Sequence, residues 1–374
     1  MLLLTEGGAR LLGFRPRYPT SSGLPPAMTS LGYFYRSDPE LGFRLRSDGR
    51  FYSRACEPPV WITTDRLGFR NGFGWSPDRD LPLVLFLGDS TTLCAEVADD
   101  ETGPSEVARR LVPQHAIRVL NAGVGGYNTV QVKRMLERCL RMFPHRVKAA
   151  VYTFCDNDFA ENVGEISYPP LQAPIMTRTA SGQWVEKEIE NPVVPWGSDY
   201  LKLKYQLVAL HSRATPWWAP SLWLYPHSAL ASAMRQAFHR RDSLPGEGGA
   251  MLPGVSEEAA RKLAAGEPLE LLLREMREIS AASGVALLVT RFTTAGPQDS
   301  DEGFIDDHYL ADACRRAGVQ FVSIKAAFTG ERRSYMTRLP GHTGYDPHYS
   351  PQGTRAYAEA LAPSIEAALR AAGL

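Results

Sequence analysis

Two alternating patterns of apolar residues organise the chain from Leu81 onward. One is a set of short, continuously apolar runs, as expected for strands buried on both faces of a parallel sheet. The other places apolar residues three and four positions apart, which is typical of amphipathic helices. The predicted strands span 81–88, 117–123, 149–154, 285–292 and 319–324, and the predicted helices span 104–111, 132–143, 269–279 and 307–317, with a last helix beginning at Ser350. Five buried strands that alternate with helices predict a three-layer α/β/α domain with a mainly parallel sheet.

Two segments interrupt this alternation. Residues 1–80 are rich in Pro, Gly, Arg and aromatic side chains, with small strands indicated at 51–54 and 60–64, and we interpret them as an extension packed on the main domain, which spans 81–374. The Pro-rich stretch at about 160–255 is interpreted as an insertion that emerges near the carboxyl edge of the sheet. Its aromatic segment 215–230 is favoured to form a small core of its own. The alternative is a lid or an acyl-binding surface.

Composition and charge exclude several classes of partner. The 374 residues are 44% hydrophobic and 22% charged, so the chain can bury a sizeable core. Lys and Arg number 41, as do Asp and Glu, which gives a formal net charge of zero. A nucleic acid or an anionic membrane is therefore disfavoured as a partner, because binding by bulk electrostatics needs a basic surface. The five cysteines are scattered and form no Cys-x-x-Cys pair, which disfavours a disulfide framework and a zinc ribbon.

The sequence contains no apolar run of about 18 residues, so we expect no membrane span. The opening MLLLTEGGARLLGF has too short an apolar run and an early Glu6, and it fails as a signal peptide. The lack of an export signal favours the cytoplasm. A periplasmic or membrane-proximal location is the alternative, if MLLL is the end of an anchor missing from this sequence. We expect no cofactor, and the oligomeric state is left open.

Polar residues follow the predicted strands at the edge where parallel sheets bind ligands. These motifs are Gly88-Asp89-Ser90, the segments 121–126 and 156–158, and Asp346-Pro347-His348 before the last helix. Nucleophilic catalysis needs a hydroxyl or thiol, a base within hydrogen-bond reach and a group that orients the base. Ser90, His348 and Asp346 supply these three roles. Each motif alone is more often a turn or a cap, but their combination at one sheet edge favours a catalytic site.

Acyl transfer also needs hydrogen-bond donors for the developing oxyanion. The candidates are the N–H of Ser90 at a helix entrance, the N–H of Gly126 and the side-chain amide of Asn157. Glycine suits position 126 because the backbone can approach a substrate closely where no Cβ is present. We therefore predict an oxyanion hole formed by these three residues.

Together these motifs resemble the SGNH (GDSL-type) hydrolase family, over about residues 81–156 and 255–374. The matching elements are GDSTT at 88–92, NAGVGG at 121–126, the Asn157-Asp158 pair and DPHYSPQG at 346–353. The resemblance implies a flavodoxin-like fold, Ser90 as nucleophile, a triad completed by Asp346 and His348, and Ser90, Gly126 and Asn157 as the oxyanion hole. The segment TTDRLGFRN at 63–71 is similar to the lead-in of long bacterial members, many of which act on esters of cell-surface glycans.

The resemblance implies a serine ester hydrolase that works through an acyl-enzyme, or an enzyme that transfers the acyl group to a sugar hydroxyl. The expected substrate carries a small acyl group, such as acetyl, on a carbohydrate. Three departures from the family pattern stand out: Cys94 replaces a frequent Gly, Cys155-Asp156 precedes Asn157 where Gly-x is usual, and Asp346-x-His348 is one residue shorter than Asp-x-x-His. Asp156 matters most, because a carboxylate near an oxyanion hole opposes the developing charge unless it points away.

Three other interpretations remain open on the sequence alone. Cys94 lies one helical turn after Ser90 and could be the nucleophile, although free cysteines are more often buried apolar side chains. His342, Asp346 and His348 could bind a metal ion in a metal-dependent hydrolase, although no further ligand cluster appears at the other strand ends. The chain could also be a catalytically silent glycan-binding protein, which is favoured if Asp156 disables the oxyanion hole.

Overall fold

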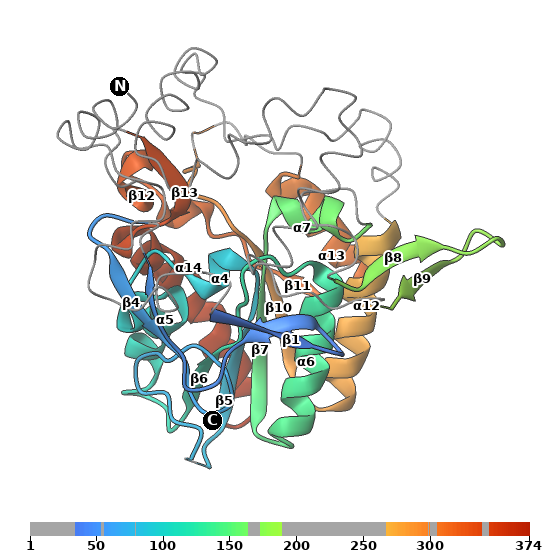
Figure 1. Cartoon of the computed structure of the whole chain (residues 1–374), viewed down its shortest axis with the longest axis horizontal. Coiled ribbons are helices and arrows are strands. Elements are labelled where there is room, and N and C mark those ends of the chain that lie inside the picture. Colours follow the sequence, from blue (N-terminus) through green and yellow to red (C-terminus); the bar gives the residue numbers. More distant parts are fainter. Residues whose placement is uncertain are drawn as a thin grey trace, which may run out of the picture.

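The computed structural model describes residues 34–53, 56–78, 80–163, 173–188, 267–297, 299, 305–338 and 344–374. Its centre is a five-stranded sheet in the order β11-β10-β7-β5-β6 (Figure 1). Every neighbouring pair in this sheet is parallel. The strands are β5 (Leu83–Gly88), β6 (Arg118–Asn121), β7 (Val147–Phe154), β10 (Ala286–Arg291) and β11 (Gln320–Phe321). The chain reverses its direction of winding between β5 and β7, which is where ligands bind in such sheets, and the predicted α/β/α fold class is confirmed.

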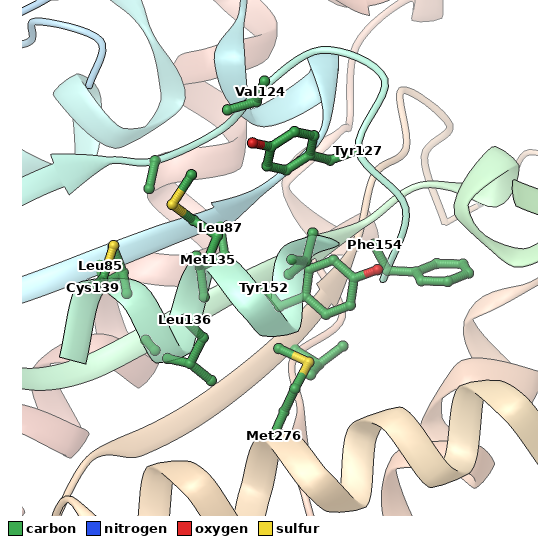
Figure 2. Close-up of a cluster of buried hydrophobic side chains, with 14 of the residues drawn as sticks. Leu85, Leu87, Val124, Tyr127, Met135, Leu136, Cys139, Tyr152, Phe154 and Met276 are labelled. Atoms are coloured by element: carbon green, nitrogen blue, oxygen red, sulfur yellow. The ribbon is translucent and has the colours of Figure 1, made fainter. Parts of the chain in front are cut away.

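Alternating side chains of β5 pack against the two helical layers. Val84 and Phe86 belong to a buried cluster shared with α5 (Gly103–Leu111) and α14 (Pro351–Ala371). Leu85 and Leu87 belong to a second cluster, on the side of α6 (Thr129–Met142), α12 (Glu267–Ala282) and α13 (Asp307–Ala317). Figure 2 shows part of this second cluster, with Leu85 and Leu87 near Met135 and Tyr152. Because successive side chains of a strand point to opposite faces of the sheet, alternate residues of β5 pack against different helical layers.

The predicted last strand is shorter than its apolar run. The pattern predicts a strand over 319–324, whereas β11 covers only Gln320–Phe321. It lies at the edge of the sheet and pairs with β10 alone, so only one side of its backbone is hydrogen-bonded to a strand. One further bond joins the N–H of Val322 to the carbonyl of Val289, and the chain then enters the 3-10 helix η3 (Lys325–Ala327).

Two antiparallel hairpins precede the sheet in the chain. The first joins β1 (Tyr35–Asp38) to β2 (Gly42–Leu45), and the second joins β3 (Arg50–Ser53) to β4 (Val60–Thr63), which confirms the small strands expected at 51–54 and 60–64. Aromatic and aliphatic side chains of both hairpins, among them Tyr35 and Phe51, join the same buried cluster as Leu85. The hydroxyl of Tyr127 donates a hydrogen bond of 2.6 Å to the carbonyl of Phe43. The division of the chain at residue 80 stays a prediction.

Several short elements complete the described part. They are α4 (Ser90–Leu93), α7 (Asp156–Glu161), the 3-10 helices η1 (Asp99–Glu101) and η4 (Arg332–Tyr335), and the strand pairs β8 (Ile175–Arg178) with β9 (Trp184–Lys187) and β12 (Met336–Arg338) with β13 (Tyr345–Tyr349). The aromatic segment 215–230 lies outside the described residues. Within those residues, no helix has both the length and the apolar character needed to cross a membrane.

Candidate active site

Ser90 is the first residue of α4, which follows strand β5 of the sheet. The chain turns sharply at Gly88, where φ is 152° and an added Cβ would lie 2.3 Å from Thr92 Oγ1 and 2.8 Å from the carbonyl of Thr153. Only glycine fits there. Asp89 then caps α4, because its Oδ1 accepts hydrogen bonds of 2.8 Å from both the N–H and the hydroxyl of Thr91. The tight turn and the cap together fix Ser90 at the carboxyl end of the sheet.

Asp346 and His348 belong to β13, which is anchored by contacts of the two residues that follow His348. The hydroxyl of the following Tyr349 donates to the carbonyl of Thr293 at 3.0 Å. Ser350 then caps α14, as predicted: its Oγ accepts from the N–H of Gly353 at 3.2 Å and donates to the carbonyl of Ser334 at 2.7 Å. These bonds fix the direction of the strand that carries the imidazole.

The structure brings the three predicted triad residues together, although Ser90 and His348 are 258 positions apart. His348 Nε2 lies 2.8 Å from Ser90 Oγ, and His348 Nδ1 is hydrogen-bonded to Asp346 Oδ1. The same carboxylate oxygen accepts the backbone N–H of His348 at 3.0 Å. The shortened Asp-x-His spacing thus still lets one carboxylate orient the ring. This is the geometry of a nucleophile, a base and an orienting acid.

The charges around His348 change its proton affinity. Burial alone would lower the pKa of His348, but the negative charge of Glu96 and the hydrogen bond to Asp346 outweigh it and raise the pKa to about 10. Burial acts to raise the pKa of Asp346, and the hydrogen bond and charge of His348 overcome this and hold the pKa below its usual range. Asp346 is therefore ionised beside an imidazole that binds protons strongly.

The predicted oxyanion-hole residues lie on three separate elements. The N–H of Ser90 is at the start of α4, Gly126 has a φ of 84° in the turn after β6, and Asn157 lies in α7. The amide Nδ2 of Asn157 donates to Glu161 Oε2 at 3.2 Å, which orients that side chain. Gly125 is also close to the nucleophile, since a Cβ added there would lie 3.7 Å from Ser90 Cβ. The assignment of the hole to Ser90, Gly126 and Asn157 stays a prediction.

The carboxylate of Asp156 is paired with a buried arginine. Arg291, at the end of β10, contacts Asp156 through Nε to Oδ1 at 3.0 Å and through Nη2 to Oδ2 at 3.2 Å, and its side chain is only 4% exposed. A bidentate pair of this kind holds the carboxylate in one direction and offsets its charge. The reason for expecting Asp156 to disable an oxyanion hole is thereby removed.

Cys94 has the properties of a structural side chain. It is buried, its thiol donates to the carbonyl of Thr91, and burial raises its pKa to about 12. A thiol with that pKa is protonated at neutral pH and is a poor nucleophile. The backbone of Cys94 has a φ of 54°, in the left-handed region. That conformation explains why glycine is suited to this position.

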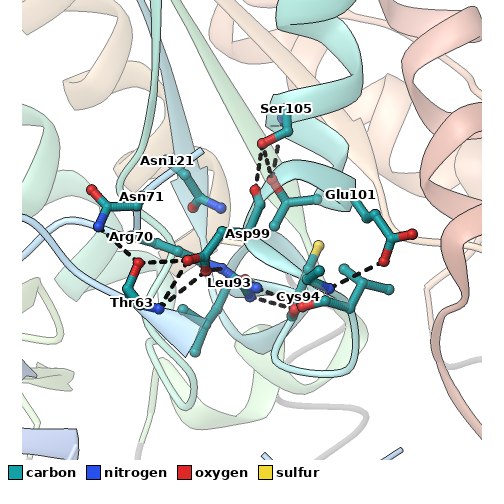
Figure 3. A network of polar contacts seen from close by, with 12 residues as sticks. Thr63, Arg70, Asn71, Leu93, Cys94, Asp99, Glu101, Ser105 and Asn121 are labelled. Carbon is teal, nitrogen blue, oxygen red and sulfur yellow. Dashed lines mark hydrogen bonds and ion pairs between the residues drawn. The ribbon is translucent and has the colours of Figure 1, made fainter. Parts of the chain in front are cut away.

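Two charged residues that the sequence did not single out lie at the segment that follows Ser90. Arg70 is fully buried and donates to the carbonyls of Leu93 and Cys94, and to that of Val97 at 2.6 Å (Figure 3). Glu96, inside the segment that Arg70 holds, lies with Oε1 3.9 Å from His348 Nδ1. Arg70 falls in the family-like segment 63–71, which is a signal that could have indicated it. Glu96 carries no such signal.

The metal-binding hypothesis requires His342, Asp346 and His348 to converge. Among the residues that the structure describes, no three His, Cys, Asp or Glu side chains converge as metal ligands. His342, the third ligand of the predicted cluster, lies outside those residues. A cavity of about 470 Å³ is lined by residues including Arg36, Arg44 and Arg138, but neither Ser90 nor His348 lines it. This cavity is separate from the triad.

No protein-family model and no curated protein sequence matches this chain. The chain is similar to solved structures at low identity. TesA is 11% identical, with a TM-score of 0.38, over 76% of this chain and 99% of that chain. A catalytic mutant of Axe2, an acetylxylan esterase from Geobacillus stearothermophilus, is 13% identical, with a TM-score of 0.38, over 79% and 95%. LAE5, an alpha/beta hydrolase enzyme from the metagenome of Lake Arreo, is 11% identical, with a TM-score of 0.34, over 76% and 95%.

Proposed function

We propose that this protein is a serine ester hydrolase that works through an acyl-enzyme. The observation that carries the proposal is the contact of 2.8 Å between Ser90 Oγ and His348 Nε2, with Asp346 bonded to the other ring nitrogen. His348 takes the proton of Ser90 as Oγ attacks the ester carbonyl, and the resulting imidazolium gives that proton to the leaving alcohol. Water then attacks the acyl-enzyme by the same route.

The remaining residues have assigned roles in this proposal. Asp346 holds the imidazole in the tautomer that accepts a proton at Nε2. The N–H groups of Ser90 and Gly126 and the amide of Asn157 stabilise the oxyanion of the tetrahedral intermediate. Asn157 is turned by its bond to Glu161, and one of its two amide protons remains for the substrate.

The proposed substrate is a small acyl ester, such as acetyl, on a carbohydrate. Support comes from the motifs at 88–92, 121–126 and 346–353, whose family resemblance implies such esters. If a sugar hydroxyl replaces water in the second half-reaction, the same site performs O-acyl transfer. Supplying acetylated xylo-oligosaccharides with and without an acceptor sugar separates the two outcomes, because only transfer gives a new acetylated product.

Turnover of p-nitrophenyl acetate by the wild type, S90A and D346N tests the reaction class. Removing the nucleophile should abolish turnover, and D346N should lower kcat by about 100-fold or more, as the base loses its orienting partner. The wild type should keep full activity in EDTA. Unchanged activity in folded S90A would refute the proposal, and loss of activity in EDTA would favour the metal-dependent alternative at His342, Asp346 and His348.

A further inference from the structure

Glu96 is a buried carboxylate directed at the imidazole of the triad. Its side chain is 8% exposed, and its Oε1 lies 3.9 Å from His348 Nδ1, on the same ring nitrogen that bonds Asp346. Its other oxygen, Oε2, is buried and has no hydrogen-bond partner among the described residues. An ionised carboxylate in such a place is costly unless a positive charge compensates it.

The loop that carries Glu96 is fixed by a separate set of bonds. Arg70 binds the backbone carbonyls of Leu93, Cys94 and Val97, so the segment on both sides of Glu96 is held by one guanidinium. Asp99 contacts Arg70 Nε at 3.3 Å and accepts from the N–H of Thr63. Glu96 therefore reaches His348 from a rigid backbone, rather than by movement of a surface loop.

We propose that Glu96 is a positioning residue that supports the triad. It is a second carboxylate, in addition to Asp346, whose charge stabilises the imidazolium of His348. This inference rests on the proposed function. When His348 takes the proton of Ser90, positive charge appears on the ring, 3.9 Å from Glu96 in the present geometry. The interaction is stronger with the imidazolium than with the neutral ring, so it stabilises the charged ring that forms when Ser90 attacks. In the free enzyme the same charge raises the pKa of His348, and so raises the pH above which the ring is neutral and can act as the base.

The two carboxylates have different surroundings and hence different roles. Asp346 is 34% exposed and makes the direct hydrogen bond that orients the ring. Glu96 makes no such bond to the ring and acts through its charge, which the low local polarity strengthens. Burial raises the pKa of Glu96, and the charge of His348 is the largest opposing influence. Glu96 and His348 therefore titrate as a coupled pair.

Other charged and titratable groups face this pair and are kept unchanged in the test. The groups whose charge shifts the pKa of Glu96 or His348, or whose own pKa is shifted by Glu96, are Tyr35, Cys56, Arg70, Asp89, Cys94 and Asp346. Arg70 lowers the pKa of Glu96, whereas Asp346 raises it. A substitution confined to position 96 isolates the contribution of its charge.

The test measures the pKa of His348 by NMR in S90A, which needs no turnover. Imidazole ¹⁵N signals of the 8 histidines are titrated, and His348 is assigned with H348N. In S90A/E96Q the pKa of His348 should fall by about one unit or more, corresponding to a tenfold change in proton affinity, whereas S90A/E96D should keep most of the elevation. S90A/E101Q is the matched control, because Glu101 lies on the same loop and caps the N–H of Ala98.

Kinetics with intact Ser90 give the second readout. In E96Q the acid limb of the pH profile of kcat/KM for p-nitrophenyl acetate should move to lower pH, because the pKa of the base falls. On the plateau of the profile, kcat should fall about tenfold. E101Q should match the wild type. If E96Q does not fold, E96M removes the charge at similar volume and takes its place. A folded variant with an unchanged pKa of His348 overturns this inference alone, whereas absence of turnover in the wild type overturns the proposed function and leaves the NMR result valid.

Discussion

At the scale of single residues, the site depends on how its charges are paired. Asp156 stands next to Asn157, the proposed oxyanion donor, and an unpaired carboxylate there would oppose catalysis. Arg291 prevents this, because its buried guanidinium binds both oxygens of Asp156. Asp158, one residue beyond Asn157, is fully buried and accepts from the hydroxyl of Tyr152 at 2.7 Å. Burial raises the pKa of Asp158 well above its usual range.

Removing Arg291 should therefore damage catalysis through charge. In R291M the carboxylate of Asp156 loses its bidentate partner, and we expect kcat for p-nitrophenyl acetate to fall about tenfold, since one unfavourable charge interaction of this size costs about 1.4 kcal/mol in the transition state. The double variant R291M/D156N should recover most of the activity. Steady-state kinetics and melting temperatures of both variants are the measurements. Equal activity of the single and double variants would show that Asp156 does not oppose the oxyanion.

At the scale of elements, a buried arginine connects the amino-terminal hairpins to the helix that carries Ser90. Arg70 follows β4, and its backbone also forms an isolated bridge with Asn121 at the end of β6. The Asn121 amide in turn donates to the carbonyl of Thr92 in α4 at 2.9 Å. Figure 3 shows the contacts of Arg70 with Leu93 and Cys94, at the end of this short helix. A four-residue helix has little stability of its own, so its position depends on these contacts.

Substitution of Arg70 should destabilise the protein and loosen Ser90. R70A leaves three buried carbonyls without their donor, and we expect a loss of about 3–5 kcal/mol in the free energy of unfolding. Denaturant titration measures it. R66A is the control: Arg66 pairs with Asp78 at the surface, where both side chains are more than half exposed, and such pairs contribute less than about 1 kcal/mol. A comparable loss in both variants would contradict the role given to Arg70.

At the scale of the whole molecule, the sequence pattern predicts much of the fold and the proximity of Ser90, Asp346 and His348. Continuous apolar runs predict the strands because both faces of the sheet are covered by helices. Ser90 is predictable because a parallel sheet places its strand ends at one edge, and Asp346 and His348 are predictable because their motif stands just before the last helix. Glu96 belongs to no motif, and Arg291, although it ends β10, gains its role only through its contact with Asp156. The extent of β11 depends on its edge position, which its apolar pattern does not encode.

A network of ion pairs joins the amino-terminal hairpin to α6 and β9. Arg138 of α6 binds Asp38 through two bonds of 2.8 Å and Glu40 through bonds of 2.7 and 3.1 Å. Arg134, one turn earlier, binds Glu186 of β9 at 2.8 Å. Burial acts to raise the pKa of Asp38, but the bonds from Arg138 overcome it and lower the pKa. A carboxyl group with a lowered pKa stabilises the fold while it is ionised.

The contribution of Asp38 should therefore depend on pH with a definite sign. It is present in full above the unfolded-state pKa of about 3.9 and is lost as the pH falls through the lower folded-state value. D38N should be less stable than the wild type at pH 7 by about 1–3 kcal/mol, and the difference should shrink below about pH 4. Melting temperatures measured from pH 3 to pH 8 test this, with D80N as the control because Asp80 is 93% exposed. A difference that persists at low pH would contradict the account.

Covalent labelling tests the central claim most directly, because it reports the identity and the activation of the nucleophile together. The wild type and S90A are treated with a fluorophosphonate, and intact mass is recorded with peptide mapping of the modified residue. We predict one adduct per chain on Ser90 of the wild type, none on S90A, and slow labelling of H348A, which lacks the base. Rapid labelling of S90A, or no labelling of the folded wild type, would contradict the proposed serine mechanism.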